Sequence, residues 1–83
     1  MKLISDLKLG DKVFVINKRN NTFDIAEVIE ILNSAIRFQC YLNNEAFYLW
    51  RYYQKNKHET DYKIIFTDET EAVEEFKQLL WQQ

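Results

Sequence analysis

Asparagine divides this sequence into short apolar runs. The 83 residues contain no proline and a single glycine, Gly10, so the usual turn-forming residues are almost absent. Asparagine can replace them because its side chain tolerates the left-handed backbone that tight turns require. Seven asparagines lie between apolar runs: Asn17, Asn20, Asn21, Asn33, Asn43, Asn44 and Asn56. This spacing predicts several short strands joined by tight turns.

Four of these runs have the composition of strands. The range 35–42 alternates well, with Ile36, Phe38, Cys40 and Leu42 predicted on one face. The polar stretch Gln54–Thr60 is predicted to be a loop. The four runs predicted as strands are Lys12–Ile16, Ala35–Leu42, Glu45–Tyr53 and Tyr62–Thr67.

Residues 24–32 allow two interpretations. Ile25, Val28, Ile29 and Leu32 have helical spacing, and Asp24 with Glu27 resembles a capping box. The run is also rich in β-branched residues, which pack better on a pleated sheet. We favour a strand, and the shift of its apolar face predicts a bulge or a sharp bend near Ala26-Glu27.

The range 68–83 is predicted to be an amphipathic helix. Asp68 is suited to cap it, and Glu71 stands three residues later. We expect the helix to pack over the open end of the sheet, with Trp81 at the end of its packed stripe. The apolar positions recur at helical spacing: Ala72, Val73, Phe76, Leu79 and Leu80.

These elements predict a single α+β domain over residues 1–83: a small antiparallel barrel or bent sheet of about five strands (1–67) and a C-terminal helix (68–83). The segment Leu9-Gly10-Asp11-Lys12-Val13-Phe14-Val15 resembles the opening of many SH3-like barrels. The segment 64–72 is similar to a strand-to-helix junction in small SH3-like proteins of unknown function from phages and mobile elements of Firmicutes. The long aromatic strand and basic loop between them depart from that pattern. The resemblance implies the fold and supplies no functional residue.

The composition argues against catalysis and against a metal or cofactor site. With one cysteine (Cys40) and one histidine (His58), the chain cannot form an internal disulfide or a four-ligand zinc site. One glycine is too few for a phosphate-binding loop. We therefore expect no enzyme activity, no cofactor and no metal, with Cys40 in the core. The longest apolar run, Ala46–Trp50, is too short to cross a membrane, and we expect a cytoplasmic protein with no membrane partner.

The run Glu45–Tyr53 carries large side chains at both alternating sets of positions. One interpretation is that the core covers one side and the terminal helix the other. The other is an exposed aromatic ladder formed by Tyr48, Trp50 and Tyr52, which would anchor a protein partner. Three cations follow closely, and rings interleaved with cations also suit single-stranded nucleic acid. These cations are Arg51, Lys55 and Lys57.

The charge is unevenly distributed. Residues 68–83 carry five acidic side chains and one basic side chain, whereas the body is mildly basic. Glu71, Glu74 and Glu75 form either a solvated helix face or a negative stripe for a basic partner. The leading hypothesis is a non-enzymatic protein-binding module, and the resemblance favours a phage-borne inhibitor that blocks a host or defence complex. Nucleic-acid binding is the alternative, and a homodimer formed through the ladder is a third interpretation.

Overall fold

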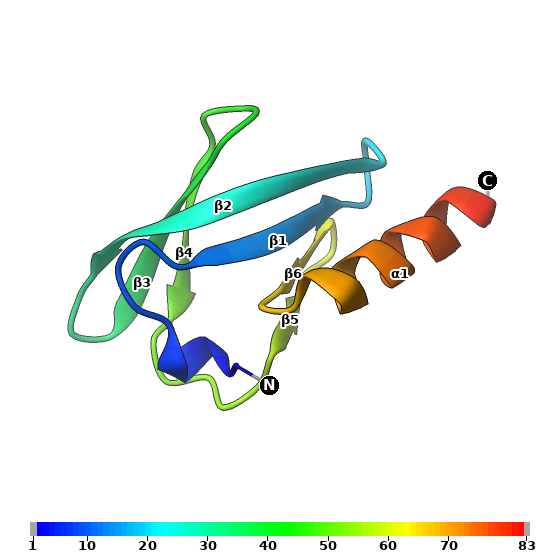
Figure 1. Ribbon diagram of the computed structural model, residues 1–83. Coiled ribbons are helices and arrows are strands. Elements are labelled where there is room, and N and C mark those ends of the chain that lie inside the picture. Colours follow the sequence, from blue (N-terminus) through cyan, green and yellow to red (C-terminus); the bar gives the residue numbers. More distant parts are fainter. Residues whose placement is uncertain (1, 83) are drawn as a thin grey trace.

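The fold is a curled antiparallel sheet with one helix packed on it. The computed structural model describes residues 2–82, in which one six-stranded sheet has the order β4-β3-β2-β1-β6-β5 (Figure 1). This half-barrel confirms the predicted α+β class, with one strand more than expected. The elements are η1 (Ile4–Asp6), β1 (Lys12–Asn17), β2 (Thr22–Ile31), β3 (Ala35–Cys40), β4 (Ala46–Trp50), β5 (Lys57–Glu59), β6 (Lys63–Phe66) and α1 (Glu69–Trp81).

The ambiguous range 24–32 lies in β2, so the strand interpretation is confirmed. The bulge is displaced from the predicted position, because the register with β3 shifts between Val28 and Glu30. Asp24, Ala26 and Val28 all face the interior and keep a regular alternation up to that point. This alternation is not evident from the sequence, because two of the inward positions are occupied by an aspartate and an alanine rather than by large apolar residues.

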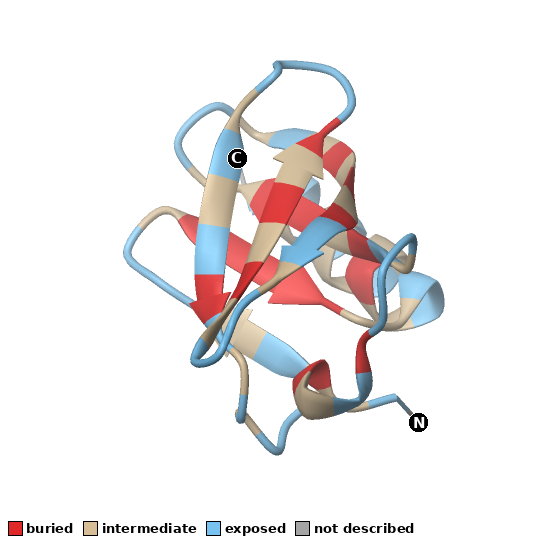
Figure 2. Cartoon of the chain, turned by 90° about the vertical axis from the view of Figure 1, so that its left-hand side faces the viewer, coloured by how far each residue is buried: buried red, intermediate tan, exposed pale blue. Residues whose placement is uncertain are grey.

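The inner face of the sheet forms the main core. Buried positions alternate with more exposed ones along the strands (Figure 2). Cys40 is buried there, as predicted. Residues of the N-terminal segment also belong to this core. The Ile4 and Ser5 N–H groups attach the segment by donating to the carbonyls of Lys55 and Tyr53, at 2.8 and 3.0 Å. The core residues are Ile4, Leu7, Val13, Val15, Ala26, Val28, Ile36, Phe38, Cys40, Leu49 and Ile65.

Helix α1 packs on the outer face of β1 and β6, so the prediction that it closes the open end of the sheet is wrong. β1 is apolar on both faces: Val13 and Val15 point inward, while Phe14 and Ile16 point toward the helix. The carboxylate of Asp68 caps the helix as predicted, accepting the Glu71 N–H at 2.9 Å. The residues of this second core are Ile16, Ile64, Phe66 and Ala72, with Phe14, Phe23, Phe76 and Leu79 packed against them.

Several predicted element ends are also corrected. β3 stops at Cys40, and Leu42 lies exposed in the following turn rather than on the inner face. The predicted loop 54–60 contains β5, whose short polar sequence has no apolar alternation and which is held by backbone pairing with β6. The last turn of α1 extends past the strands (Figure 1), which leaves Trp81 88% exposed instead of packed. None of the helices within residues 2–82 is long and apolar enough to cross a membrane.

Candidate functional site

The aromatic ladder lies on β4, at one edge of the sheet. Register pairs Tyr48 with Arg37 and Trp50 with Ala35 on the outer face, whereas Phe47 and Leu49 point into the core. The side chains of Tyr48, Trp50 and Tyr52 are 57%, 52% and 50% exposed. The interpretation that α1 covers this side of the strand is therefore wrong, because α1 packs over β1 and β6 instead.

Neighbouring groups hold the rings in place. The Trp50 ring meets Tyr52 and Tyr53 edge-on, with centroids 5.7 and 5.3 Å apart, and Tyr53 stacks on His58 at 4.8 Å. The Tyr52 hydroxyl donates to the Asn33 carbonyl at 3.0 Å. Tyr52 therefore ties the turn between β2 and β3 to the end of β4. Trp50 and Tyr52 are thus half exposed and are also held by contacts within the chain.

Cations lie beside the rings of this edge. The guanidinium carbons of Arg37 and Arg51 are 5.9 and 5.6 Å from the ring centroids of Tyr48 and Tyr52. The Lys55 ammonium is 4.6 Å from the ring centroid of Tyr53. Within residues 2–82 none of these three cations forms an ion pair, whereas Lys2, Lys18, Lys63 and Lys77 each do. Sequence reasoning missed Arg37 because its proximity to Tyr48 depends on the register of β3 with β4.

The nine residues predicted to contact a partner do not form one site. Tyr48, Trp50, Arg51, Tyr52 and Lys55 lie along or just beyond β4, and with Arg37 and Tyr53 they constitute what we call the aromatic edge. The other four, Lys57, Glu71, Glu74 and Glu75, line a shallow groove between β5 and α1.

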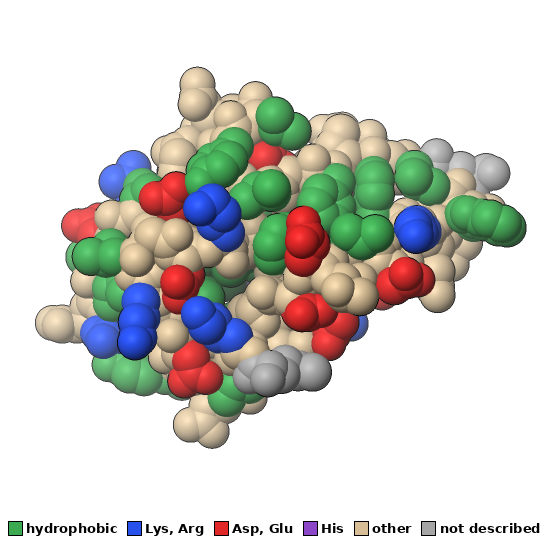
Figure 3. All heavy atoms as spheres, in the orientation of Figure 1, with side chains coloured by type: hydrophobic (Ala, Val, Ile, Leu, Met, Phe, Trp, Pro, Cys, Tyr) green, Lys and Arg blue, Asp and Glu red, His purple; other side chains and the backbone are tan. Residues whose placement is uncertain are grey.

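In that groove the Lys57 ammonium lies 5.7 Å from the Phe66 ring centroid. The Asn56 side-chain amide donates to Glu71 at 2.9 Å. Figure 3 shows basic and acidic side chains mixed over one face of the molecule, with acidic ones prevailing toward the helix. The groove is lined by three glutamates and one lysine, whereas the charged residues of the aromatic edge are basic.

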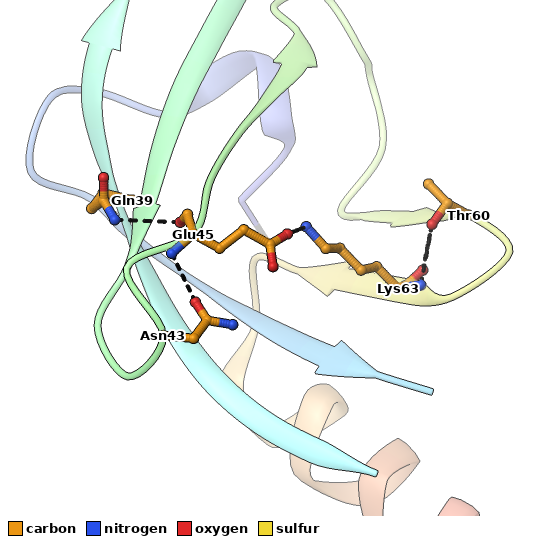
Figure 4. Close-up of polar contacts among 5 residues, drawn as sticks. All are labelled: Gln39, Asn43, Glu45, Thr60 and Lys63. Carbon is orange, nitrogen blue, oxygen red and sulfur yellow. Dashed lines mark hydrogen bonds and ion pairs between the residues drawn. The ribbon is translucent and has the colours of Figure 1, made fainter. Parts of the chain in front are cut away.

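A second hollow lies among the β1–β2 turn, the β3–β4 turn and the start of β6. It has a volume of about 220 Å3, and we call it the hairpin pocket. Lys63, only 5% exposed, forms an ion pair there with Glu45, reaching from β6 to the start of β4 (Figure 4). The Asn43 side-chain oxygen accepts the Glu45 N–H at 2.9 Å, and the Thr60 hydroxyl accepts the Lys63 N–H at 3.1 Å. The only feature of the sequence that points to this ion pair is Lys63 itself, a lysine at the start of an otherwise apolar strand.

Asp24 and Cys40 also line the hairpin pocket. Asp24 is 8% exposed, and its carboxylate accepts the N–H groups of Ile25 and Leu42 at 2.7 and 3.2 Å. Burial, and to a smaller extent the negative charge of Asp24, raises the pKa of the Cys40 thiol to about 11. The thiol is therefore protonated at neutral pH and is a poor nucleophile.

His58 and the acidic side chains are the remaining titratable groups of interest among the described residues. His58 is half-buried, and burial together with the Lys55 charge lowers its pKa below the ordinary 6.5. Across residues 2–82 no group of three or more His, Cys, Asp or Glu side chains is placed to hold a metal ion. Comparison of the chain with protein-family models, curated proteins and solved structures finds no match. The functional argument therefore rests on the geometry of this chain.

Proposed function

We propose that this protein is a non-enzymatic protein-binding module that contacts its partner through the aromatic edge. The observation that carries the proposal is the half exposure of Tyr48, Trp50 and Tyr52 at one edge of the sheet, with Trp50 and Tyr52 held by contacts within the chain. Tyrosine and tryptophan dominate the energetics of protein interfaces because each buries a large area. Rings that are already ordered lose little conformational entropy on binding.

The backbone of β4 adds a second means of contact. The Arg51 N–H donates to the Ser34 carbonyl, and the Cys40 N–H donates to the Glu45 carbonyl, so the backbone groups of Glu45 and Arg51 face β3. Alternation in an antiparallel ladder then directs the N–H and C=O groups of Ala46, Tyr48 and Trp50 away from β3. No other strand of residues 2–82 pairs with that side of β4. An extended partner segment could add to this edge as a further strand.

The positive charge of the aromatic edge favours a partner segment flanked by acidic groups. Arg37, Arg51 and Lys55 lack ion-pair partners within residues 2–82, and each lies near a ring face. Acidic groups flanking the partner segment would pair with them, which favours the correct partner more than it raises affinity. Binding would act by steric occupation of a partner's site, and an inhibitory role against a host or defence complex remains a prediction from the resemblance alone.

The test is affinity capture from nuclease-treated bacterial lysate, with captured proteins identified by mass spectrometry. Wild type is compared with Trp50→Ala, with Ala46→Pro, and with Trp81→Ala as a matched control that removes an exposed tryptophan elsewhere. Trp50→Ala should weaken binding by about 2 kcal/mol, roughly 30-fold. Ala46→Pro removes one outward N–H and leaves the ladder intact. Capture of the same proteins by all four baits would contradict the proposal.

Single-stranded nucleic acid is the second candidate, favoured by the cations at the ring faces. Fluorescence anisotropy with a labelled 15-nucleotide oligothymidylate separates the two. A nucleic-acid binder should lose affinity steeply as salt rises, in proportion to the phosphates it contacts. The protein-binding proposal predicts no measurable affinity. Sedimentation of wild type and Trp50→Ala tests the homodimer, since a dimer built on the ladder should dissociate in the variant.

A further inference from the structure

The hairpin pocket holds more negative than positive charge. The carboxylates of Asp24 and Glu45 line it together with a single ammonium, that of Lys63. Lys63 is already engaged by Glu45. Asp24 forms no ion pair within residues 2–82, although it is one of the most buried charged side chains described. The pocket therefore contains a buried carboxylate without a counter-ion.

Backbone contacts satisfy Asp24 only in part. Two N–H groups, those of Ile25 and Leu42, donate to its oxygens. These two N–H groups make three contacts with the carboxylate, which has about four acceptor positions, and neither N–H group carries a charge. A buried charge is costly unless it is both paired and hydrogen-bonded. A cationic group with several N–H donors would provide both kinds of interaction.

We propose that the hairpin pocket binds a primary alkylammonium group, with its N–H donors on Asp24 and its alkyl stem against Val15 and Leu42. The volume of about 220 Å3 admits an ammonium with a short chain, whereas pockets for drug-sized molecules are larger. Leu42, exposed in the turn after β3, provides an apolar wall at the mouth. An anion is disfavoured, because it would meet Asp24 and compete with Glu45 for Lys63.

This site is independent of the aromatic edge, since it lies at the start of β4 among the hairpin turns rather than at Trp50. The ammonium could belong to a lysine side chain of a protein or to a free amine. Both offer the same head group, and the experiment below distinguishes them.

The test is a titration of 15N-labelled protein followed by two-dimensional NMR at pH 7 and constant ionic strength. The probe is n-butylammonium, with butyrate and n-butanol as matched probes of opposite and zero charge. We expect saturable shifts at Asp24, Ile25, Cys40 and Leu42 for butylammonium only, with a millimolar dissociation constant suited to so small a ligand. Absence of saturable shifts, or equal shifts with all three probes, would overturn the proposal.

Two variants sharpen the test. Asp24→Asn keeps an oxygen acceptor for Leu42 and removes the charge, so affinity should fall at least tenfold, while Asp61→Asn at an exposed loop position should leave it unchanged. Should Asp24→Asn fail to fold, Glu45→Gln makes the pocket neutral overall and should also abolish the preference for butylammonium over butyrate. Preference retained in a folded Glu45→Gln variant, or affinity retained in Asp24→Asn, would contradict the assignment.

Two further probes identify the source of the ammonium. Nα-acetyl-lysine methylamide represents a protein side chain, and putrescine represents a free amine. Stronger binding of the lysine derivative supports a partner's lysine as the occupant, and stronger binding of putrescine supports a free amine. Failure of both to match butylammonium would overturn the assignment of a natural alkylammonium ligand.

Discussion

The outer face of the sheet has two halves that differ in cover and in chemistry. Over β1 and β6, α1 buries Ile16, Ile64 and Phe66 almost completely. Over β3 and β4, no helix of residues 2–82 packs on Tyr48 and Trp50, and both stay about half exposed. The covered half is aliphatic and phenylalanine-rich, while the bare half uses tyrosine, tryptophan and arginine, whose polar tips tolerate water. The bare half is therefore a surface in its own right rather than a core that lacks a second helix.

The largest expected effect comes from opening the covered half. Phe66→Ala removes a ring that is buried between β6 and α1, and a substitution of this kind costs about 3–5 kcal/mol. Urea unfolding followed by circular dichroism measures it. A domain of this size has little stability to spare, so complete unfolding is also consistent with the prediction, whereas a cost below about 1 kcal/mol would contradict the two-core description.

A smaller loss is expected when the helix loses its cap. Asp68→Ala removes the acceptor for the Glu71 N–H, and such changes cost about 1 kcal/mol. Asp68→Asn is the matched control, because asparagine caps about as well as aspartate. Equal losses for the two variants would show that the negative charge at the helix N-terminus matters more than the hydrogen bond.

The bare half should contribute much less to stability. Trp50→Ala removes a half-exposed ring that contacts Tyr52 and Tyr53, and we expect a cost of about 0.5 kcal/mol, typical of surface positions. The same urea experiment applies. A cost comparable with that of Phe66→Ala would mean that the two halves do not differ as described, and partner loss in this variant could then reflect unfolding.

The smallest effect concerns His58, whose ring stacks on Tyr53, which in turn meets Trp50 edge-on. Burial and the nearby Lys55 ammonium lower the pKa of His58 below 6.5. The unfolded chain then takes up a proton before the folded chain does, so stability is full above about pH 6.5 and declines as the pH falls through that value. Urea midpoints at pH 7.5 and 5.5 should differ more for wild type than for His58→Phe, and an equal pH dependence would refute the assignment.

The helices and strands could be predicted from the sequence more accurately than the way they pack on one another. Asparagine turns and β-branched runs are local signals, so β1, β3, β4, β6 and α1 were expected close to where they lie. The position of α1 depends on which strand is apolar on both faces. That β1 is buried on both faces becomes clear only when the residues that pack on each face are known. For the same reason the ladder was found but its exposure was not, and Arg37 and the Lys63–Glu45 pair depend on residues far apart in the chain.

The pairing of β1 with β6 has a consequence for how the chain folds. Strands β1 to β4 pair in succession and can form as neighbouring hairpins. The pairing of β1 with β6 instead joins residues far apart in the chain, because Asn17 pairs with Lys63, which follows 46 residues later. Contacts so distant in sequence close slowly. Until β6 arrives, β1 presents a free hydrophobic edge, and α1, which follows β6, cannot yet cover Phe14 and Ile16. The slow step of folding and the moment of greatest aggregation risk therefore coincide.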